Sequence, residues 1–211
     1  MHTENNKTSN DFQVHPINYW GPYILYQHLD KSFSDKLLNE GKKLTQKNDW
    51  SKNLVGQLNK QLAYKIQPWI TNGVVPYVNM WVDGWNHFSG MQFQAKNASL
   101  ERIWINFQKS GDYNPEHTHG GADLSFVMYL KVPKSIRDAY DLHTSSPKNR
   151  DCPPGAINFK YGEYNKFAVS GRHVCPRENT IYMFPSYVRH QVAAFSGEGE
   201  RVSVAGNIIF L

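Results

Sequence analysis

Cysteines are scarce in this chain of 211 residues, which contains only Cys152 and Cys175. The two do not form a C-x-x-C pair, so the sequence predicts neither a zinc ribbon nor a disulfide framework. One bridge between them remains open. Two separate thiols are the simpler expectation, because disulfides are rare in the cytosol.

Long apolar runs are also absent. No stretch reaches the roughly 18 uninterrupted apolar residues of a membrane-spanning helix. The N-terminal segment, MHTENNKTSNDF, is polar and lacks the apolar core of a signal peptide. We therefore expect a soluble cytoplasmic protein with no membrane partner.

Clusters of positive charge are missing, although the formal net charge is +5. The basic residues are scattered, and no run is denser than Gly41-Lys42-Lys43. Nucleic-acid binding is therefore not predicted, whereas a mildly basic surface favours small acidic molecules. Hydrophobic residues make up 40% and aromatic residues 14% of the chain, which is typical of a globular, β-rich protein.

The chain divides into a flexible tail at 1–12 and a single domain at 13–211. Within this domain, residues 13–99 are expected to be helical support. Helical spacing predicts one helix over 32–47 and further helical segments within 54–86. Because Pro68 and Pro76 interrupt the second region, we expect two or three short pieces there.

From residue 100 the periodicity changes to that of strands, and residues 100–211 are expected to form the β core. A polar segment at 135–154, rich in proline, is expected to be a loop over one mouth of the sheets. Helices followed by many short strands indicate an α+β, mainly β fold: a double-stranded β-helix of the jelly-roll or cupin type, buttressed by N-terminal helices. The predicted strands are 100–107, 124–132, 156–159, 180–184, 189–195 and 201–211.

Three histidines form the most informative pattern. His117-Thr118-His119 places two imidazoles at positions i and i+2, which lie on one side of a strand. His190 follows about seventy residues later, beside a late predicted strand. Neutral imidazoles suit divalent iron, and three protein ligands leave coordination positions open. The three histidines are therefore candidate ligands of one metal ion.

Two longer segments carry a resemblance to a known family. The first is WINFQKSGDYNPEHTH at 104–119, followed by LSFVMYLKVP at 124–133; the second joins FPSYVRH at 184–190 to ERVSVAGN at 200–207. Together they resemble the Fe(II)/2-oxoglutarate-dependent oxygenases, and within them the branch related to prolyl 4-hydroxylases that is common in bacteria and phages. The resemblance covers about residues 100–211.

The resemblance implies a centre that uses Fe(II), 2-oxoglutarate and O2. His117 matches the first iron ligand and His190 the distal one. Arg201 matches the basic residue that binds the far carboxylate of 2-oxoglutarate, for which a guanidinium is suited because it forms two parallel hydrogen bonds. Ser203 adds a hydroxyl donor, and the remaining candidates for the co-substrate pocket are Tyr113, Asn106 and Tyr129.

His119 departs from the usual superfamily pattern, which has an aspartate or glutamate at this position. We interpret the site as a three-histidine variant with one negative charge fewer. Asp123 is the fallback ligand, although it also fits a turn residue before the strand at 124. Asp112 and Glu116 are weaker alternatives.

The family predicts hydroxylation of a C–H bond in a small-molecule or peptide substrate, with release of succinate and CO2. A prolyl residue as the target rests on kinship alone. Two alternatives stay open at this point: a three-histidine cupin dioxygenase that does not use 2-oxoglutarate, and a non-catalytic jelly-roll binding module. The sequence is also compatible with a homo-oligomer.

Overall fold

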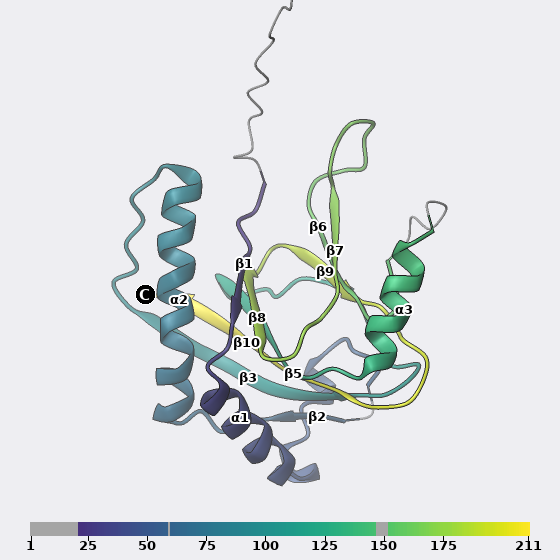
Figure 1. The fold of residues 1–211 in the computed structure, drawn as a ribbon. Helices are drawn as coiled ribbons and strands as arrows, with labels where there is room; N and C mark the ends of the chain where they lie inside the picture. Colours follow the sequence, from purple (N-terminus) through teal and green to yellow (C-terminus); the bar gives the residue numbers. More distant parts are fainter. Residues whose placement is uncertain (1–20, 59, 147–151) are drawn as a thin grey trace, which may run out of the picture.

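Two antiparallel sheets face each other in the computed structural model, which describes residues 21–58, 60–146 and 152–211 (Figure 1). The predicted tail at 1–12 lies outside the described residues. The larger sheet has six strands in the order β1-β8-β5-β10-β3-β2. These strands are β1 (Leu25–His28), β8 (Thr180–Pro185), β5 (Leu124–Lys131), β10 (Arg201–Phe210), β3 (Ala98–Gln108) and β2 (Lys60–Ala63).

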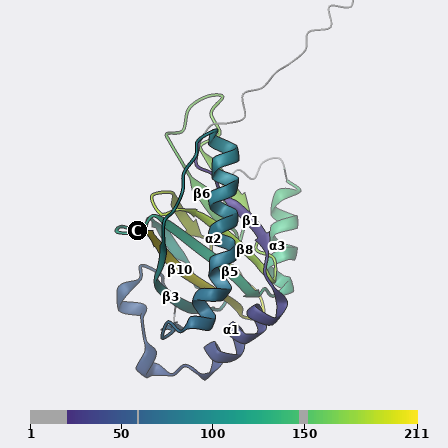
Figure 2. The same cartoon turned by 90° about the vertical axis from the view of Figure 1, so that its left-hand side faces the viewer.

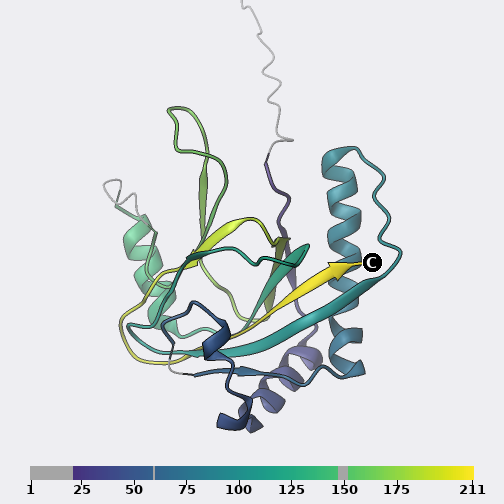
Figure 3. The same cartoon turned by 180° about the vertical axis from the view of Figure 1, so that it is seen from behind.

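The smaller sheet has four strands in the order β4-β9-β6-β7. Its strands are β4 (Asn114–His117), β9 (Arg189–Val192), β6 (Ile157–Lys160) and β7 (Gly171–Val174). The two sheets, with helices attached to the larger one, are a double-stranded β-helix, which confirms the predicted fold class. The long strands β3 and β10 run side by side across the larger sheet (Figure 3).

One hydrophobic core lies between the larger sheet and the helices α1 (Lys31–Lys43) and α2 (Pro68–Ser89), which cover its outer face (Figure 2). Helix α1 begins where the Asp30 carboxylate accepts the Phe33 amide at 2.9 Å, a typical N-cap. Helix α2 buries one face at helical spacing. Its buried residues are Ile70, Val74, Tyr77, Val78 and Trp81.

A second, smaller core fills the space between the two sheets. It consists of Tyr129, Ile157, Phe159, Tyr182, Phe184, Val188 and Val192. The strands β5, β6, β8 and β9 contribute all of these side chains except that of Val188, which lies between β8 and β9, so both sheets share one apolar layer. A polar site between the sheets would therefore be bordered by these apolar side chains.

The expectation of purely helical support at 13–99 is wrong in two places. Strands β1 and β2 both join the larger sheet, and β2 occupies part of the region expected to be helical. Helix α2 is one continuous helix rather than several pieces: Pro68 is at its first turn, where a missing N–H is tolerated, and Pro76 lies inside it. Two short 3-10 helices, Gln46–Asn48 and Ser51–Asn53, follow α1.

The polar segment expected to be a loop at 135–154 contains helix α3 (Lys134–Thr144). The helix is short and mostly polar, and Ile136 is its one buried residue. Strands β4 and β7 were not predicted either. Among the described ranges, no helix is both long and apolar enough to cross a membrane.

Candidate metal centre

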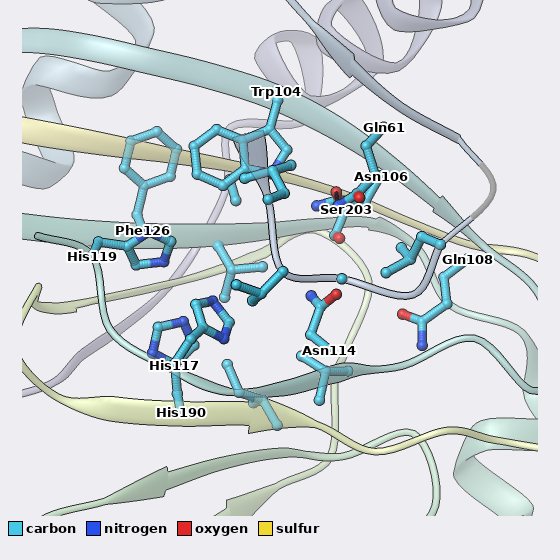
Figure 4. Close-up of a pocket in the computed structure, with 18 of the residues that line it drawn as sticks. Gln61, Trp104, Asn106, Gln108, Asn114, His117, His119, Phe126, His190 and Ser203 are labelled. Atoms are coloured by element: carbon cyan, nitrogen blue, oxygen red, sulfur yellow. Dashed lines mark hydrogen bonds between the residues drawn. The ribbon is translucent and has the colours of Figure 1, made fainter. Parts of the chain in front are cut away.

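The structure brings His117, His119 and His190 together between the two sheets. His117 ends β4 and lies opposite His190 of β9 in the strand register, while His119 lies two residues beyond β4. Their candidate ligand atoms all lie within 4.8 Å of one another. The three imidazoles gather at one end of a cavity (Figure 4). One metal ion could therefore take a nitrogen from each.

Two of the imidazoles are oriented by backbone carbonyls. Nδ1 of His117 is 2.8 Å from the Pro115 carbonyl oxygen, and Nδ1 of His190 is 2.9 Å from that of Val188. Because a carbonyl only accepts, each Nδ1 carries the proton and donates it. This arrangement leaves Nε2 of both rings free to bind a metal.

Burial keeps the three imidazoles neutral at pH 7. It lowers the pKa of His117 below its ordinary value, that of His119 to about 4 and that of His190 to about 3. In each case desolvation of the charged form is the largest cause, and repulsion between the neighbouring rings adds to it for His119 and His190. Metals bind neutral imidazole, so the site needs no deprotonation at neutral pH.

These pKa values predict how acid affects the metal-free protein. His190 binds a proton below pH 6.5 when the chain is unfolded, but only near pH 3 when it is folded. The unfolded state therefore binds more protons between these values, and the free energy of unfolding falls as the pH drops below 6.5. The loss is at most about 1.4 kcal/mol per pH unit for each histidine. Urea unfolding at a series of pH values measures it, and a His190→Gln variant should show a shallower slope. Equal slopes would contradict the prediction.

Arg201, which is 2% exposed at the start of β10, also lines the cavity, and its hydrogen-bond partner Gln108 lies at the end away from the histidines (Figure 4). Its Nη1 donates to the Gly155 carbonyl at 2.9 Å and its Nη2 donates to the Gln108 side chain. Tyr129 lies beside it, with the guanidinium carbon 5.7 Å from the ring centroid. Within the described residues, neither Nε of Arg201 nor the Tyr129 hydroxyl has a hydrogen-bond partner.

Of the other residues predicted to bind the co-substrate, two line the cavity and one does not. Ser203 and Asn106 are buried, lie opposite each other on β10 and β3, and line the cavity. Tyr113 is 43% exposed and does not line it. Its backbone pairs with that of Gln57 in an isolated bridge.

The alternative carboxylate ligands lie outside the histidine group. The Asp123 side chain accepts the amide of Phe210, at the end of β10, at 2.8 Å. The Asp112 side chain accepts the Lys109 amide at 2.9 Å, and Glu116 forms ion pairs with Lys160 and Arg189. None of the three belongs to the cluster of ligand atoms, so His119 is the middle candidate ligand.

Several amide side chains in the cavity were not predicted from the sequence. Gln61, Gln108 and Asn114 line it, and the Gln61 amide donates to the Asn106 side chain at 3.0 Å. Figure 4 shows Gln108 at the end away from the histidines. A signal for Gln108 existed, because it follows Asn106 by two residues on one strand and so shares its face. Gln61 and Asn114 had no such signal.

The cavity fits an iron ion together with a small dicarboxylate. Its volume is about 120 Å³, below the roughly 300 Å³ at which pockets for drug-sized ligands begin. One end offers three neutral imidazoles. The other offers a buried guanidinium and a buried phenol with unused donors, and these are the groups that a carboxylate satisfies.

A family model described as "Putative 2OG-Fe(II) oxygenase" matches residues 102–207 of the chain. The matched region contains the three histidines, Arg201 and Ser203. It spans half of the sequence. Among curated proteins, none matches this chain.

Solved structures with a similar fold include several prolyl hydroxylases. A viral collagen prolyl hydroxylase from Paramecium Bursaria Chlorella virus-1, in complex with 2OG, superposes with a TM-score of 0.56 at 14% identity, covering 89% of this chain and 96% of that one. A prolyl-4-hydroxylase from Pseudomonas putida gives 0.53 at 13% identity, with coverages of 89% and 92%. A Trichoplax adhaerens prolyl hydroxylase in complex with a hypoxia inducible factor peptide superposes with a TM-score of 0.53 at 14% identity, covering 90% of this chain and 84% of that one.

Proposed function

This chain belongs to the 2OG-Fe(II) oxygenase family, and we propose that it hydroxylates a C–H bond of its substrate with His117, His119 and His190 as the iron ligands. Arg201, Ser203 and Tyr129 bind the distal carboxylate of 2-oxoglutarate. Asn106 lines the same pocket. The enzyme uses Fe(II), 2-oxoglutarate and O2, as the family does.

A single observation carries this assignment. One cavity has three neutral imidazoles at one end and a buried arginine with an unused donor at the other. The first end is suited to a metal and the second to a carboxylate. A 2-oxo dicarboxylic acid has a metal-chelating 2-oxo acid group and a distal carboxylate, so one molecule can use both ends.

When bound, the iron centre with 2-oxoglutarate and O2 supplies the oxidant that removes hydrogen from a C–H bond, and 2-oxoglutarate leaves as succinate and CO2. The protein contributes orientation and a dry site. Phe184 packs against the His190 ring at 4.8 Å and helps to exclude water. Burial raises the pKa of Tyr129 to about 12, so its phenol stays protonated and can donate to a carboxylate.

We also propose a prolyl residue in a peptide as the substrate. The support is the shared fold with enzymes named prolyl hydroxylases, which is an argument by analogy. Because iron and the co-substrate would occupy the small cavity, a peptide would bind outside it.

Incubation with proline-containing peptides, Fe(II) and 2-oxoglutarate tests the substrate. The expected result is a mass gain of one oxygen atom on a prolyl residue, matched by an equal amount of succinate, and neither in the absence of 2-oxoglutarate. Hydroxylation of another residue or molecule, with no prolyl peptide modified, would overturn the prolyl assignment and leave the oxygenase standing.

The two alternatives account for less of the site. A cupin dioxygenase that does not use 2-oxoglutarate explains the three histidines but gives no role to the buried Arg201 and Ser203. A non-catalytic binding module does not agree with the family, whose members are oxygenases.

A further inference from the structure

The partners of Arg201 in the structure are uncharged. Among the described residues, its guanidinium hydrogen-bonds one side chain, that of Gln108, and one backbone carbonyl, that of Gly155. Both bonds hold the guanidinium in place. Neither neutralises its charge.

Gln108 is itself held firmly. It is 1% exposed, and it lies directly opposite Arg201 in the pairing of β3 with β10. Its Nε2 donates to the Asp112 backbone carbonyl at 2.5 Å. Because a carbonyl can only accept, this bond fixes which end of the amide faces which partner. Oε1 therefore faces Arg201 as an acceptor.

The positive charge of Arg201 has no counter-charge within the chain as described. None of the ion pairs formed within 21–58, 60–146 and 152–211 includes Arg201. The nearby Asp112 carboxylate accepts the Lys109 amide. A buried charge without a counter-ion is costly, so the site gains when an anion binds.

We propose that Gln108 is a positioning residue that fixes Arg201 through a neutral acceptor and so reserves its charge for the distal carboxylate of the co-substrate. Position 108 thereby sets the preference for 2-oxoglutarate over 2-oxo acids that lack this carboxylate. The inference rests on the proposed role of Arg201.

A glutamate at position 108 shows why neutrality matters. Glutamate has nearly the shape of glutamine, but its carboxylate pairs with the guanidinium directly. In this variant the glutamate carboxylate neutralises the charge of Arg201 and repels the distal carboxylate of 2-oxoglutarate. Neutral methionine, of similar length, leaves the charge of Arg201 available but removes both the Oε1 acceptor for Arg201 and the Nε2 donor to the Asp112 carbonyl.

The test compares the wild type with Q108E and Q108M after loading with Fe(II) without oxygen. Each protein is titrated with 2-oxoglutarate and, separately, with 2-oxobutyrate, which chelates the metal but has no distal carboxylate. The visible absorption band of the chelated complex reports binding without turnover. We expect the wild type to prefer 2-oxoglutarate by at least about 100-fold.

In Q108E this preference should fall below about 10-fold, through weaker binding of 2-oxoglutarate and unchanged binding of 2-oxobutyrate. The preference of Q108M should lie between those of the wild type and Q108E. If Q108E does not fold, the comparison of Q108M with the wild type is the test. Wild-type selectivity in both variants would overturn the proposal, as would an equal weakening of both acids, which indicates a merely structural role. A wild type without any preference would instead refute the role of Arg201 itself.

Discussion

A His190→Ala variant is expected to lose Fe(II) binding by more than about 100-fold and, with it, all 2-oxoglutarate turnover. Even residues that only orient metal ligands change affinity by about 10- to 100-fold when they are lost. His190 is the most buried of the three histidines, and its ring lies 4.3 Å from that of His117 and 5.1 Å from that of His119. No other described histidine, cysteine or acidic side chain joins their cluster and could replace it.

The matched control for this prediction is His87→Ala. His87 is an exposed histidine in the last turn of α2 and does not belong to the cluster. Isothermal titration under anaerobic conditions measures the affinity in both variants. If His190→Ala binds iron as tightly as His87→Ala, the three histidines are not the metal site.

Replacing Arg201 by methionine is expected to weaken 2-oxoglutarate binding by about 30- to 5,000-fold, while Fe(II) binding stays unchanged. Loss of one partner of a buried charged pair costs about 2–5 kcal/mol. Two effects on stability without ligand oppose each other: the variant removes a buried charge that has no counter-ion among the described residues, but it leaves the Gly155 carbonyl and the Gln108 side chain without their donor.

Two further variants sharpen the result. Arg201→Lys keeps the charge but loses the planar fork of donors, so it should bind 2-oxoglutarate with intermediate affinity. Arg137→Met removes an exposed arginine from α3 and should have no effect. Titration with 2-oxoglutarate on the iron-loaded proteins gives the affinities. Full wild-type affinity in Arg201→Met would favour an enzyme that does not use 2-oxoglutarate.

The β core was predictable because its strands carry a strong local signal. Residues 124–131, for example, combine β-branched and aromatic side chains in one run, and β5 occupies that range. The structure of the N-terminal region, residues 13–99, was harder to predict. β2 buries Gln61 and Leu62 on opposite faces, so its polarity does not alternate. α2 continues through Pro76 because its packed face outweighs the missing hydrogen bond.

Some residues of the candidate site were likewise predictable from the sequence, and others were not. The histidines and Arg201 were found because their spacing matches a family pattern. Tyr113 was predicted from that pattern too, yet its place depends on the local path of the chain beside β4, an edge strand that contains Pro115. Gln61 reaches the cavity from β2, a distant part of the sequence. Only the paired strands show that Gln108 contacts Arg201.

The most direct test of the proposed centre is an anaerobic titration of the metal-free protein with Fe(II), followed by 2-oxoglutarate. We expect one iron per chain and a visible charge-transfer band that appears only after 2-oxoglutarate is added. The band should be absent in His190→Ala and should require much higher 2-oxoglutarate in Arg201→Met. Iron binding with no band at any 2-oxoglutarate concentration, or no iron binding at all, would show that the three histidines and Arg201 do not form this centre.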